Sequence, residues 1–408
     1  MLLKYVVIAI LPLVSSFLPH SGGFGGLYTS LSLSTIIPSC TIKLIDPSDR
    51  FVFLPLLYEL AVGGADVDEV APRFEEILGD DVKFDKVEHV KGRAVKVEYD
   101  DRTVIVESSP TETTSLTYDY LIIASGLLPP PSPISQLQSL DRPVNAIVVG
   151  GGYSGIELST NLMSAFTTKA HKGSVALVQR SGSILPQSNS EFNKSKARKA
   201  LEGKGINVML DTTVEGVDFG GDGSDRLSVK LSKSDEEVPT DLIVYTYAGS
   251  SPPFSPPSSP YGSLVNPSVN AIETDSALRA KDTTLKRTYR NVFCIGDCAS
   301  VSEFAEKSTA QTAMAMAETA AFNVYADVRG KKAIKFKYLN LGEMLTLGDD
   351  DATISGFGDR VKLEGGLASF ARRAVYSIRQ PTNGQRVRSG LKATGKGVEK
   401  IKERKNDC

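Results

Sequence analysis

Apolar residues gather in short runs along the chain, and the clearest run predicts a strand buried in a parallel sheet. Residues 144–149 are Val-Asn-Ala-Ile-Val-Val, a composition that is typical of a strand covered on both faces. The glycine-rich segment 150–155 follows at once, then helix-forming residues from Ile156, and then a second apolar run at 175–178. This order predicts a strand, a tight turn, a helix and a strand, which together make one βαβ unit.

A second glycine-rich turn lies near the N-terminus. Residues 22–26 are Gly-Gly-Phe-Gly-Gly and lead into a predicted helix, and the run 41–45 predicts a strand that ends on Asp46. Between the two units, residues 118–126 predict a strand followed by a glycine turn. The Pro- and Ser-rich stretches 127–139 and 250–267 predict a connection between domains and an exposed loop.

The first apolar run, 5–18, has a different character. It follows Lys4, contains Pro12 and ends near small serines, and it is too short and interrupted for a transmembrane helix. We interpret it as a targeting signal, and residues 16–19 resemble the cleavage region of two-part plastid presequences. The alternative is that 4–11 forms a buried strand. If this run is a targeting signal, the chain lacks the strand that should directly precede Gly22. We hypothesise that the true first strand is missing because the gene model is incomplete.

The composition narrows the range of functions that the sequence allows. The 408 residues, with 41% apolar and 23% charged side chains, predict two or three globular domains. A net charge of -2 gives no global reason to expect nucleic acid as a partner. The four cysteines include no C-x-x-C pair and only three histidines are present, so we expect buried free thiols and no metal site.

The glycine spacing indicates dinucleotide binding. In a G-x-G-x-x-G turn the first glycine permits the turn, the second admits pyrophosphate and the third allows close helix packing. Gly150, Gly152 and Gly155 satisfy this pattern between a strand and a helix. In the first copy Gly23 and Gly26 match the second and third glycines, while Ser21 stands in place of the first.

Two carboxylates complete the pattern. Asp46 follows Gly26 by 20 positions, the usual spacing for a residue that binds the adenosine ribose. An apolar run ending in Gly296-Asp297 suits a backbone that passes close to the ribityl chain of a flavin, with the carboxylate accepting hydrogen bonds from its hydroxyl groups.

The order of these motifs, together with Ala124-Ser125-Gly126 and Ala248-Gly249, resembles the pyridine-nucleotide-dependent flavoprotein superfamily. Four stretches resemble type II (alternative) NAD(P)H:quinone dehydrogenases, especially their cyanobacterial and plastid branch: 50–60, 71–74, 341–348 and 371–373. The resemblance runs from Gly22 to about Pro381.

The resemblance implies an α/β protein with two Rossmann-like dinucleotide-binding domains, one for FAD and one for NAD(P)H, plus a small C-terminal membrane-associating region. The expected parts are a presequence (1–21), the first part of the FAD domain (22–140), the NAD(P)H domain (141–250), the return segment of the FAD domain (251–330) and the C-terminal region (331–408). The FAD contacts implied are Gly22, Gly23, Phe24, Gly26, Asp46, Pro55, Ser125, Gly126, Gly296, Asp297 and Ala310. Those implied for NAD(P)H are Gly150, Gly152, Gly155, Gln179, Arg180 and Gly249.

The resemblance also implies a reaction. Hydride passes from NAD(P)H to flavin N5, and two electrons then pass to a lipid quinone of the plastoquinone or demethylphylloquinone type, without proton pumping. Glu157 matches an acidic family position that faces the nicotinamide, or it is a carboxylate that stabilises a helix start. Gln311 matches a glutamine near the flavin and the quinone head, whereas a second family glutamine is replaced by alanine at position 315.

The predicted strand 175–178 ends on Gln179 and Arg180. An NADH site usually carries a carboxylate there for the ribose 2′-hydroxyl. A neutral and a basic residue remove repulsion of a 2′-phosphate and can pair with it, which favours NADPH, alone or alongside NADH.

Leu367, Phe370, Ala371, Ala374, Val375 and Ile378 recur at helical spacing. They predict either a helix that lies on a membrane or lipid droplet or one packed on the protein core. The branch resemblance favours a plastid, at the thylakoid or plastoglobule surface, with the mitochondrion as alternative. The oligomeric state is not fixed by the sequence, and a homodimer is compatible with it.

Two other functions stay open at this stage. One is a flavin-dependent reductase with a protein acceptor. The other is a flavin-free binding or redox-sensing protein, which the altered first turn would allow. Disulfide reductases and sulfide:quinone oxidoreductases are disfavoured, because they need reactive cysteines in positions that this chain does not fill.

Overall fold

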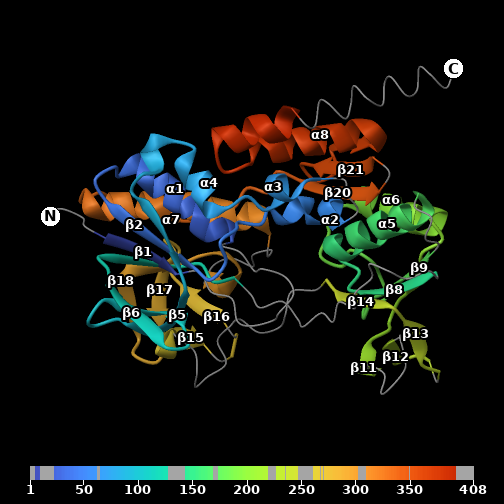
Figure 1. Ribbon diagram of the computed structural model, residues 1–408, viewed down its shortest axis with the longest axis horizontal. Coiled ribbons are helices and arrows are strands. Elements are labelled where there is room, and N and C mark those ends of the chain that lie inside the picture. The colour runs from blue at the N-terminus through green and yellow to red at the C-terminus, as the bar shows by residue number, and fades with distance from the viewer. Residues whose placement is uncertain are drawn as a thin grey trace.

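The computed structural model describes residues 5–9, 23–61, 65–126, 143–168, 173–218, 227–234, 236–246, 261–266, 268–269, 271–301, 309–348 and 350–391. Figure 1 shows two α/β units side by side, with a C-terminal region that lies across both.

The first unit is built on a sheet whose centre is parallel, in the order β18–β7–β1–β2–β3. These strands are β1 (Tyr5–Ala9), β2 (Thr41–Asp46), β3 (Val87–Lys91), β7 (Tyr120–Ile123) and β18 (Arg287–Cys294). The sheet continues through β15 (Val265–Asn266), β16 (Ala271–Thr274), β17 (Arg279–Asp282) and β19 (Ala299–Val301).

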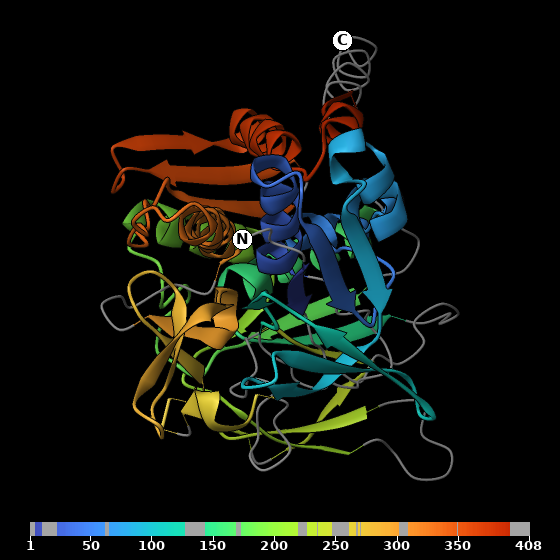
Figure 2. The ribbon, with the colours of Figure 1, turned by 90° about the vertical axis from the view of Figure 1, so that its left-hand side faces the viewer.

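Helices cover one face of this sheet. Helix α1 (Phe24–Ile36) packs against α7 (Ala310–Val328) over a continuous apolar core. The other face carries the antiparallel sheet β4 (Arg93–Glu98), β5 (Thr103–Ser109) and β6 (Glu112–Thr117) and a second core. Figure 2 shows these layers from the side of the first unit. The short helices of the unit are η1 (Leu54–Leu56), α2 (Leu57–Ala61), α3 (Val67–Val70), α4 (Phe74–Gly79), η2 (Val82–Phe84), η3 (Gly262–Leu264) and η4 (Gly296–Cys298).

The expectation that the chain lacks the strand before Gly22 is wrong. Tyr5–Ala9 forms β1, which pairs in parallel with β2 on one side and β7 on the other. Val6 is fully buried there. An apolar run flanked by a lysine and serines satisfies the pattern of a signal and of a central strand equally well, and the sheet assigns these five residues to the first unit rather than to a presequence.

The second unit confirms the predicted βαβ pattern. Strand β8 (Val144–Val149) leads through the glycine turn into α5 (Tyr153–Thr168) and on to β9 (Gly173–Val178). The parallel sheet has the order β10–β9–β8–β14 and is completed by β10 (Asn207–Met209), β14 (Leu242–Tyr245) and helix α6 (Glu191–Gly203). A small antiparallel sheet of β11 (Val214–Asp218), β12 (Leu227–Leu231) and β13 (Val238–Thr240) is appended.

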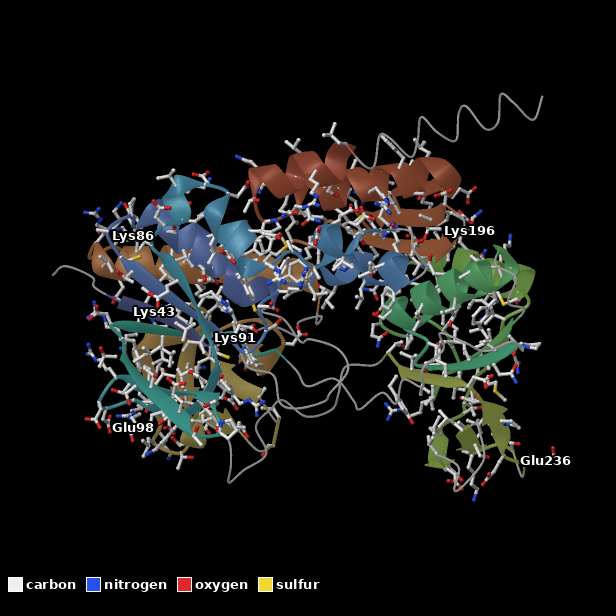
Figure 3. The ribbon with its side chains drawn as sticks, viewed as in Figure 1. Lys43, Lys86, Lys91, Glu98, Lys196 and Glu236 are labelled. Carbon is white, nitrogen blue, oxygen red and sulfur yellow. The ribbon has the colours of Figure 1, made fainter. Side chains whose placement is uncertain are left out.

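The C-terminal region joins the two units. It consists of the antiparallel sheet β20 (Glu343–Gly348), β21 (Asp351–Gly356) and β22 (Val361–Glu364), followed by α8 (Gly365–Ile378), and residues 383–391 are helical as well. Lys196 of α6, labelled at the second unit in Figure 3, pairs with Glu364. On the other side, Gly384 N–H donates to Asp80 at 2.9 Å.

Candidate dinucleotide sites and the buried charges between them

The first candidate site lies at the carboxyl edge of the parallel strands of the first unit. Gly23 is the N-cap of α1, and a Cβ at this position would meet no atom of the described residues within 4 Å. A Cβ on Gly25 would lie 3.3 Å from Ile295 and 3.5 Å from Ala124, so the start of α1, the end of β7 and the end of β18 meet here. Backbone amides at a helix start beside an open glycine suit a phosphate group.

Asp46 supplies the carboxylate of this site. It ends β2 and is fully buried. Its Oδ1 accepts the Ser48 N–H at 2.7 Å, while its Oδ2 has no partner among the described residues. Burial raises the pKa of Asp46 well above its usual value, although the Ser48 hydrogen bond acts in the opposite direction. A buried acceptor without a donor fits the hydroxyl group of a ribose.

Gly296 and Asp297 follow β18 at the same edge. Gly296 has φ of 73°, a conformation that favours glycine, and burial raises the pKa of Asp297. Ser125 is buried and Gly126 also has positive φ, at the end of β7. Pro55 lies in η1, and Ala310 begins α7. These residues fit FAD in the manner that the motif order implies.

Phe24 has a packing role. It is the first residue of α1 and is buried. Its ring lies edge-on to Phe51 and Phe53, each with ring centroids 5.3 Å apart. Phe53 in turn contacts Tyr376 of α8 at 5.8 Å. This aromatic contact joins the first glycine turn to the C-terminal helix.

The second glycine turn is tighter than the first. A Cβ on Gly155 would lie 1.7 Å from the Gly150 carbonyl oxygen, which excludes any side chain. Gly150 itself has φ of 115°. Gln179 follows β9, and its buried Oε1 accepts the Gly151 N–H at 2.7 Å, so its amide fixes the turn. Arg180 is exposed beside it.

Gly26 lies in the buried first turn of α1, and Gly152 directly precedes α5. Gly26 therefore holds the place in the first unit that Gly155 holds in the second, and Gly152 the place that Gly23 holds in the first. Gly22 and Gly249 lie outside the described residues.

Glu157 points from α5 toward the C-terminal sheet. It is buried, and its Oε1 accepts the Thr346 N–H of β20 at 3.0 Å. Burial raises the pKa of Glu157 to about 7, against the positive charge of Arg372 and the Thr346 hydrogen bond, which lower it, and with a smaller increase from Glu59. A carboxyl group with a pKa near 7 can hold or release a proton at neutral pH.

A buried ionic cluster adjoins Glu157, and the sequence did not reveal it. Glu59 of α2 accepts hydrogen bonds from both Arg372 and Arg373 of α8. Arg373 also lies 3.4 Å from Glu69 of α3, which accepts the Ser389 hydroxyl hydrogen at 2.9 Å. The only indication in the sequence was that two adjacent arginines, Arg372 and Arg373, interrupt the apolar segment 367–378.

The outer face of α8 is apolar. Leu367 is 65% exposed and Ile378 68%, whereas Arg372 is only 1% exposed. Phe370 and Val375 are exposed as well. The helix thus turns its apolar row outward and its arginines inward, which contradicts the alternative of a helix whose apolar stripe packs on the core. No helix in the described part of the chain is long and apolar enough to cross a membrane.

Gln311, the glutamine expected near the quinone, is bound to the segment that follows α7. Gln311 Nε2 donates to the Leu339 carbonyl oxygen at 3.2 Å, near the start of α7.

Cys294 and Cys298 are fully buried free thiols with sulfur atoms 3.6 Å apart, and Cys40 is also free and buried. This confirms the prediction for these three thiols, and Cys408 lies outside the described residues.

Comparisons with known proteins agree with this architecture. Residues 22–319 match the family model described as pyridine nucleotide-disulphide oxidoreductase. Demethylphylloquinone reductase NdbB of Synechocystis sp. is 30% identical over 404 residues, which cover 91% of this chain and 93% of that protein. Alternative NAD(P)H-ubiquinone oxidoreductase C1, chloroplastic/mitochondrial, of Arabidopsis thaliana is 29% identical over 424 residues, covering 91% of this chain and 78% of that protein.

Among solved structures, NDH2 from Plasmodium falciparum in complex with NADH superposes with a TM-score of 0.74 at 14% identity, over 97% of this chain and 98% of that chain. That likeness shows a shared fold. The family match and the relative at 30% identity show that the chain belongs to the pyridine nucleotide-disulphide oxidoreductase family and, within it, to the type II NAD(P)H:quinone dehydrogenases.

Proposed function

We propose that this protein is an FAD-dependent NAD(P)H:quinone oxidoreductase of the kind that does not pump protons. The observation that carries the proposal is the pair of βαβ units, of which the first presents a buried Asp46 with an unused acceptor oxygen. Relatives named as quinone reductases support the acceptor class. The chemistry that FAD supplies when bound is acceptance of hydride at N5 and delivery of two electrons.

The residues of the chain bind and orient the two cofactors. In the first unit, the open Gly23, the Asp46 carboxylate and Asp297 would hold FAD, together with the other FAD contacts named above. In the second unit, the turn Gly150–Gly155 would receive the pyrophosphate of NAD(P)H. Because Gln179 fixes that turn through Gly151, the amides at the start of α5 are held in place before the nucleotide arrives.

A proton balance gives Glu157 its role. NAD(P)H delivers a hydride, which carries one proton and two electrons, whereas reduction of a quinone to a quinol consumes two protons. One further proton must reach the quinone, and a buried carboxyl group with a pKa of about 7 is suited to store it. Gln311, near the start of α7, would lie beside the quinone head.

The acceptor is a lipid quinone reached through α8. Its exposed apolar row and the inward arginines suit a helix that lies on a membrane or lipid-droplet surface. Leu367→Glu together with Ile378→Glu should abolish co-flotation with lipid vesicles and leave turnover with a soluble quinone intact. Flotation that persists in the double variant would refute this surface.

The two named relatives favour a quinone of the plastoquinone or demethylphylloquinone type and a plastid location, at the thylakoid or plastoglobule surface, with the mitochondrion as alternative. NADPH is the favoured donor, since Gln179 and Arg180 leave no carboxylate at the end of β9. NADH favoured over NADPH by about tenfold, or 1.4 kcal/mol, would refute that preference.

An absorbance spectrum of the purified protein tests the whole proposal. Flavin bands that bleach with NADPH and return anaerobically with a soluble quinone would support cofactor, donor and acceptor class together. A return that needs an oxidised protein acceptor, such as an oxidised ferredoxin, would favour the alternative reductase. A colourless protein that FAD does not reconstitute would favour the flavin-free alternative.

A further inference from the structure

Two buried thiols flank the Gly296–Asp297 turn of the candidate FAD site. Cys294 is the last residue of β18 and Cys298 is the last residue of η4. Both side chains are fully buried, and their sulfur atoms lie 3.6 Å apart. The sulfur atoms of a disulfide are about 2.05 Å apart, so a displacement of about 1.5 Å would bring this pair to bonding distance.

The two thiols are held unequally by the fold. Cys294 is fixed in the sheet, because it pairs with Ile123 of β7 and its N–H donates to the Leu278 carbonyl oxygen at 3.1 Å. Cys298 belongs to a turn of three residues, and its thiol donates to the Ile295 carbonyl oxygen at 3.3 Å. A thiol is only a weak donor. When the two sulfur atoms approach each other, Cys298 is therefore the residue that moves.

The same turn presents two of the expected FAD contacts. Gly296 has φ of 73°, and its N–H points to the sulfur atom of Met316 in α7 at 3.2 Å. Asp297 directly precedes Cys298, so a single peptide bond joins the expected ligand of the flavin hydroxyl groups to the residue that moves. A link between Cys294 and Cys298 should therefore displace the Asp297 carboxylate and weaken FAD binding.

The surroundings of the two sulfur atoms assign them different roles. The hydrogen bond from Cys294 lowers the pKa of the Cys298 thiol, although burial acts in the opposite direction. Burial raises the pKa of the Cys294 thiol well above its usual value. Because the thiolate is the reactive form of cysteine, Cys298 is the attacking sulfur and Cys294 is the thiol that completes the bond.

We propose that Cys294 and Cys298 are a site of reversible oxidation, at which a disulfide forms and lowers the affinity of the first unit for FAD. The oxidant is hydrogen peroxide. The Cys298 thiolate attacks one peroxide oxygen and becomes a sulfenic acid, and the second oxygen leaves as hydroxide, which takes up the proton that Cys298 released. Cys294 then attacks the Cys298 sulfur, and its proton leaves with the hydroxyl group as water. Two thiols thus lose two electrons and two protons, and the peroxide becomes two molecules of water.

The inference rests on the proposed function, because FAD is the ligand whose affinity changes. Hydrogen peroxide is small enough to reach a buried thiol during local opening of the turn. A small dithiol reverses the reaction by exchange. The site therefore gives the protein a means of releasing its flavin under oxidising conditions and of binding it again under reducing conditions.

Peroxide treatment of the FAD-loaded protein, followed by mass spectrometry and FAD titration, tests the proposal. Every sample carries Cys408→Ser, which removes the fourth cysteine of the chain from exchange. We expect a product lighter by two hydrogen atoms, with a peptide link between Cys294 and Cys298. The FAD dissociation constant should rise about tenfold, as for loss of one hydrogen bond to a charged group, and dithiothreitol should restore it.

Three serine variants supply the controls. Cys294→Ser and Cys298→Ser should bind FAD as the reduced protein does and keep that affinity after peroxide. Cys40→Ser removes the other buried thiol, at the start of β2, and should respond to peroxide like its parent. If a serine variant at 294 or 298 does not fold, alanine takes its place, since the alanine side chain also cannot form the link.

The other outcomes would overturn one proposal or both. A loss of FAD that persists in Cys294→Ser would assign the effect to another group, such as the Met316 sulfur, and would refute the thiol pair. A link that forms without changing FAD affinity, or a reduced protein that binds FAD but forms no link, would refute it as well. A reduced protein that never binds FAD would instead overturn the proposed function, and the thiol pair with it.

Discussion

The two βαβ units use the same frame and fill its matching positions differently. At the end of the second strand, the first unit has Asp46 and the second has Gln179. Asp46 keeps one oxygen without a partner, whereas Gln179 uses its oxygen on the Gly151 N–H. Two residues past the third glycine, the first unit has Tyr28 and the second Glu157.

The residues at these paired positions indicate that the two units bind different ligands and contact the C-terminal region through different groups. The strand ends face the expected nucleotides, so an acid in one unit and an amide in the other predict different ligands. Tyr28 and Glu157 both contact the C-terminal region, Tyr28 by donating to the Arg379 carbonyl oxygen and Glu157 by accepting the Thr346 N–H. The C-terminal region is therefore attached to both units at equivalent points, by a neutral group in one and a titratable group in the other.

The largest expected effect comes from closing the tighter turn. Gly155→Val places carbon atoms on the Gly150 carbonyl oxygen, since even a Cβ would lie at 1.7 Å. We expect a loss of about 3 kcal/mol or more in unfolding free energy, measured by urea denaturation, and loss of NADPH binding. Gly25→Ala in the first unit is the comparison, because its Cβ would meet Ile295 at 3.3 Å. Equal losses in the two variants would contradict the difference in tightness.

Glu157 and Tyr28 should differ in how their contribution to stability depends on pH. The pKa of Glu157 is raised from its usual 4.5 to about 7 in the folded state, so its stabilising effect is complete below about 4.5 and is lost as pH rises through 7. Relative to Glu157→Gln, the wild type should lose up to about 3 kcal/mol between pH 5 and 8. Denaturation at several pH values measures this. Tyr28→Phe should instead lower the unfolding free energy by an amount that does not change between pH 5 and 8.

The strand pattern of both units could be predicted from sequence, but the identity of β1 could not. The run 144–149 has a glycine turn directly after it, which identifies it as the first strand of a βαβ unit. Residues 5–9 are separated from Gly23 by a long segment, and five apolar residues after a lysine also fit a signal. What decides the matter is pairing with β2 and β7, a long-range property that a local pattern does not contain.

The buried ionic cluster could not be predicted for a related reason. Arg372 and Glu59 are 313 residues apart in sequence, and Arg373 and Glu69 304. In the sequence, Arg372 and Arg373 lie beside the apolar residues of α8, and nothing in this local pattern indicates their partners. Which of the many acidic residues would meet them depends on how α2 and α3 pack beneath α8. Glycine turns, in contrast, carry their whole geometry in six adjacent residues.

Asp46→Asn should separate ligand binding from stability in the first unit. We expect FAD affinity to fall by about 2 kcal/mol, or roughly thirtyfold, because a charged acceptor is replaced by a neutral one. Burial raises the pKa of Asp46, so the ionised carboxylate weakens the fold at neutral pH, and the apoprotein variant should be slightly more stable than the wild type. Calorimetric FAD titration and urea denaturation measure the two effects. A variant less stable without FAD would show that Asp46 supports the fold.

The smallest expected effect comes from making the second unit resemble the first. In Gln179→Glu a carboxylate oxygen can still accept the Gly151 N–H, so the turn is retained, but a negative charge now faces any 2′-phosphate. We expect the dissociation constant of NADPH to rise about tenfold, near 1.4 kcal/mol, with that of NADH little changed.

Arg180→Ala is the companion variant, since it removes a positive charge without adding a negative one and should weaken NADPH binding less. A parallel loss for both nucleotides would show that Gln179 serves the turn and leaves nucleotide choice to other residues. A loss confined to NADPH would show that one residue at the end of β9 both fixes the turn and selects the donor.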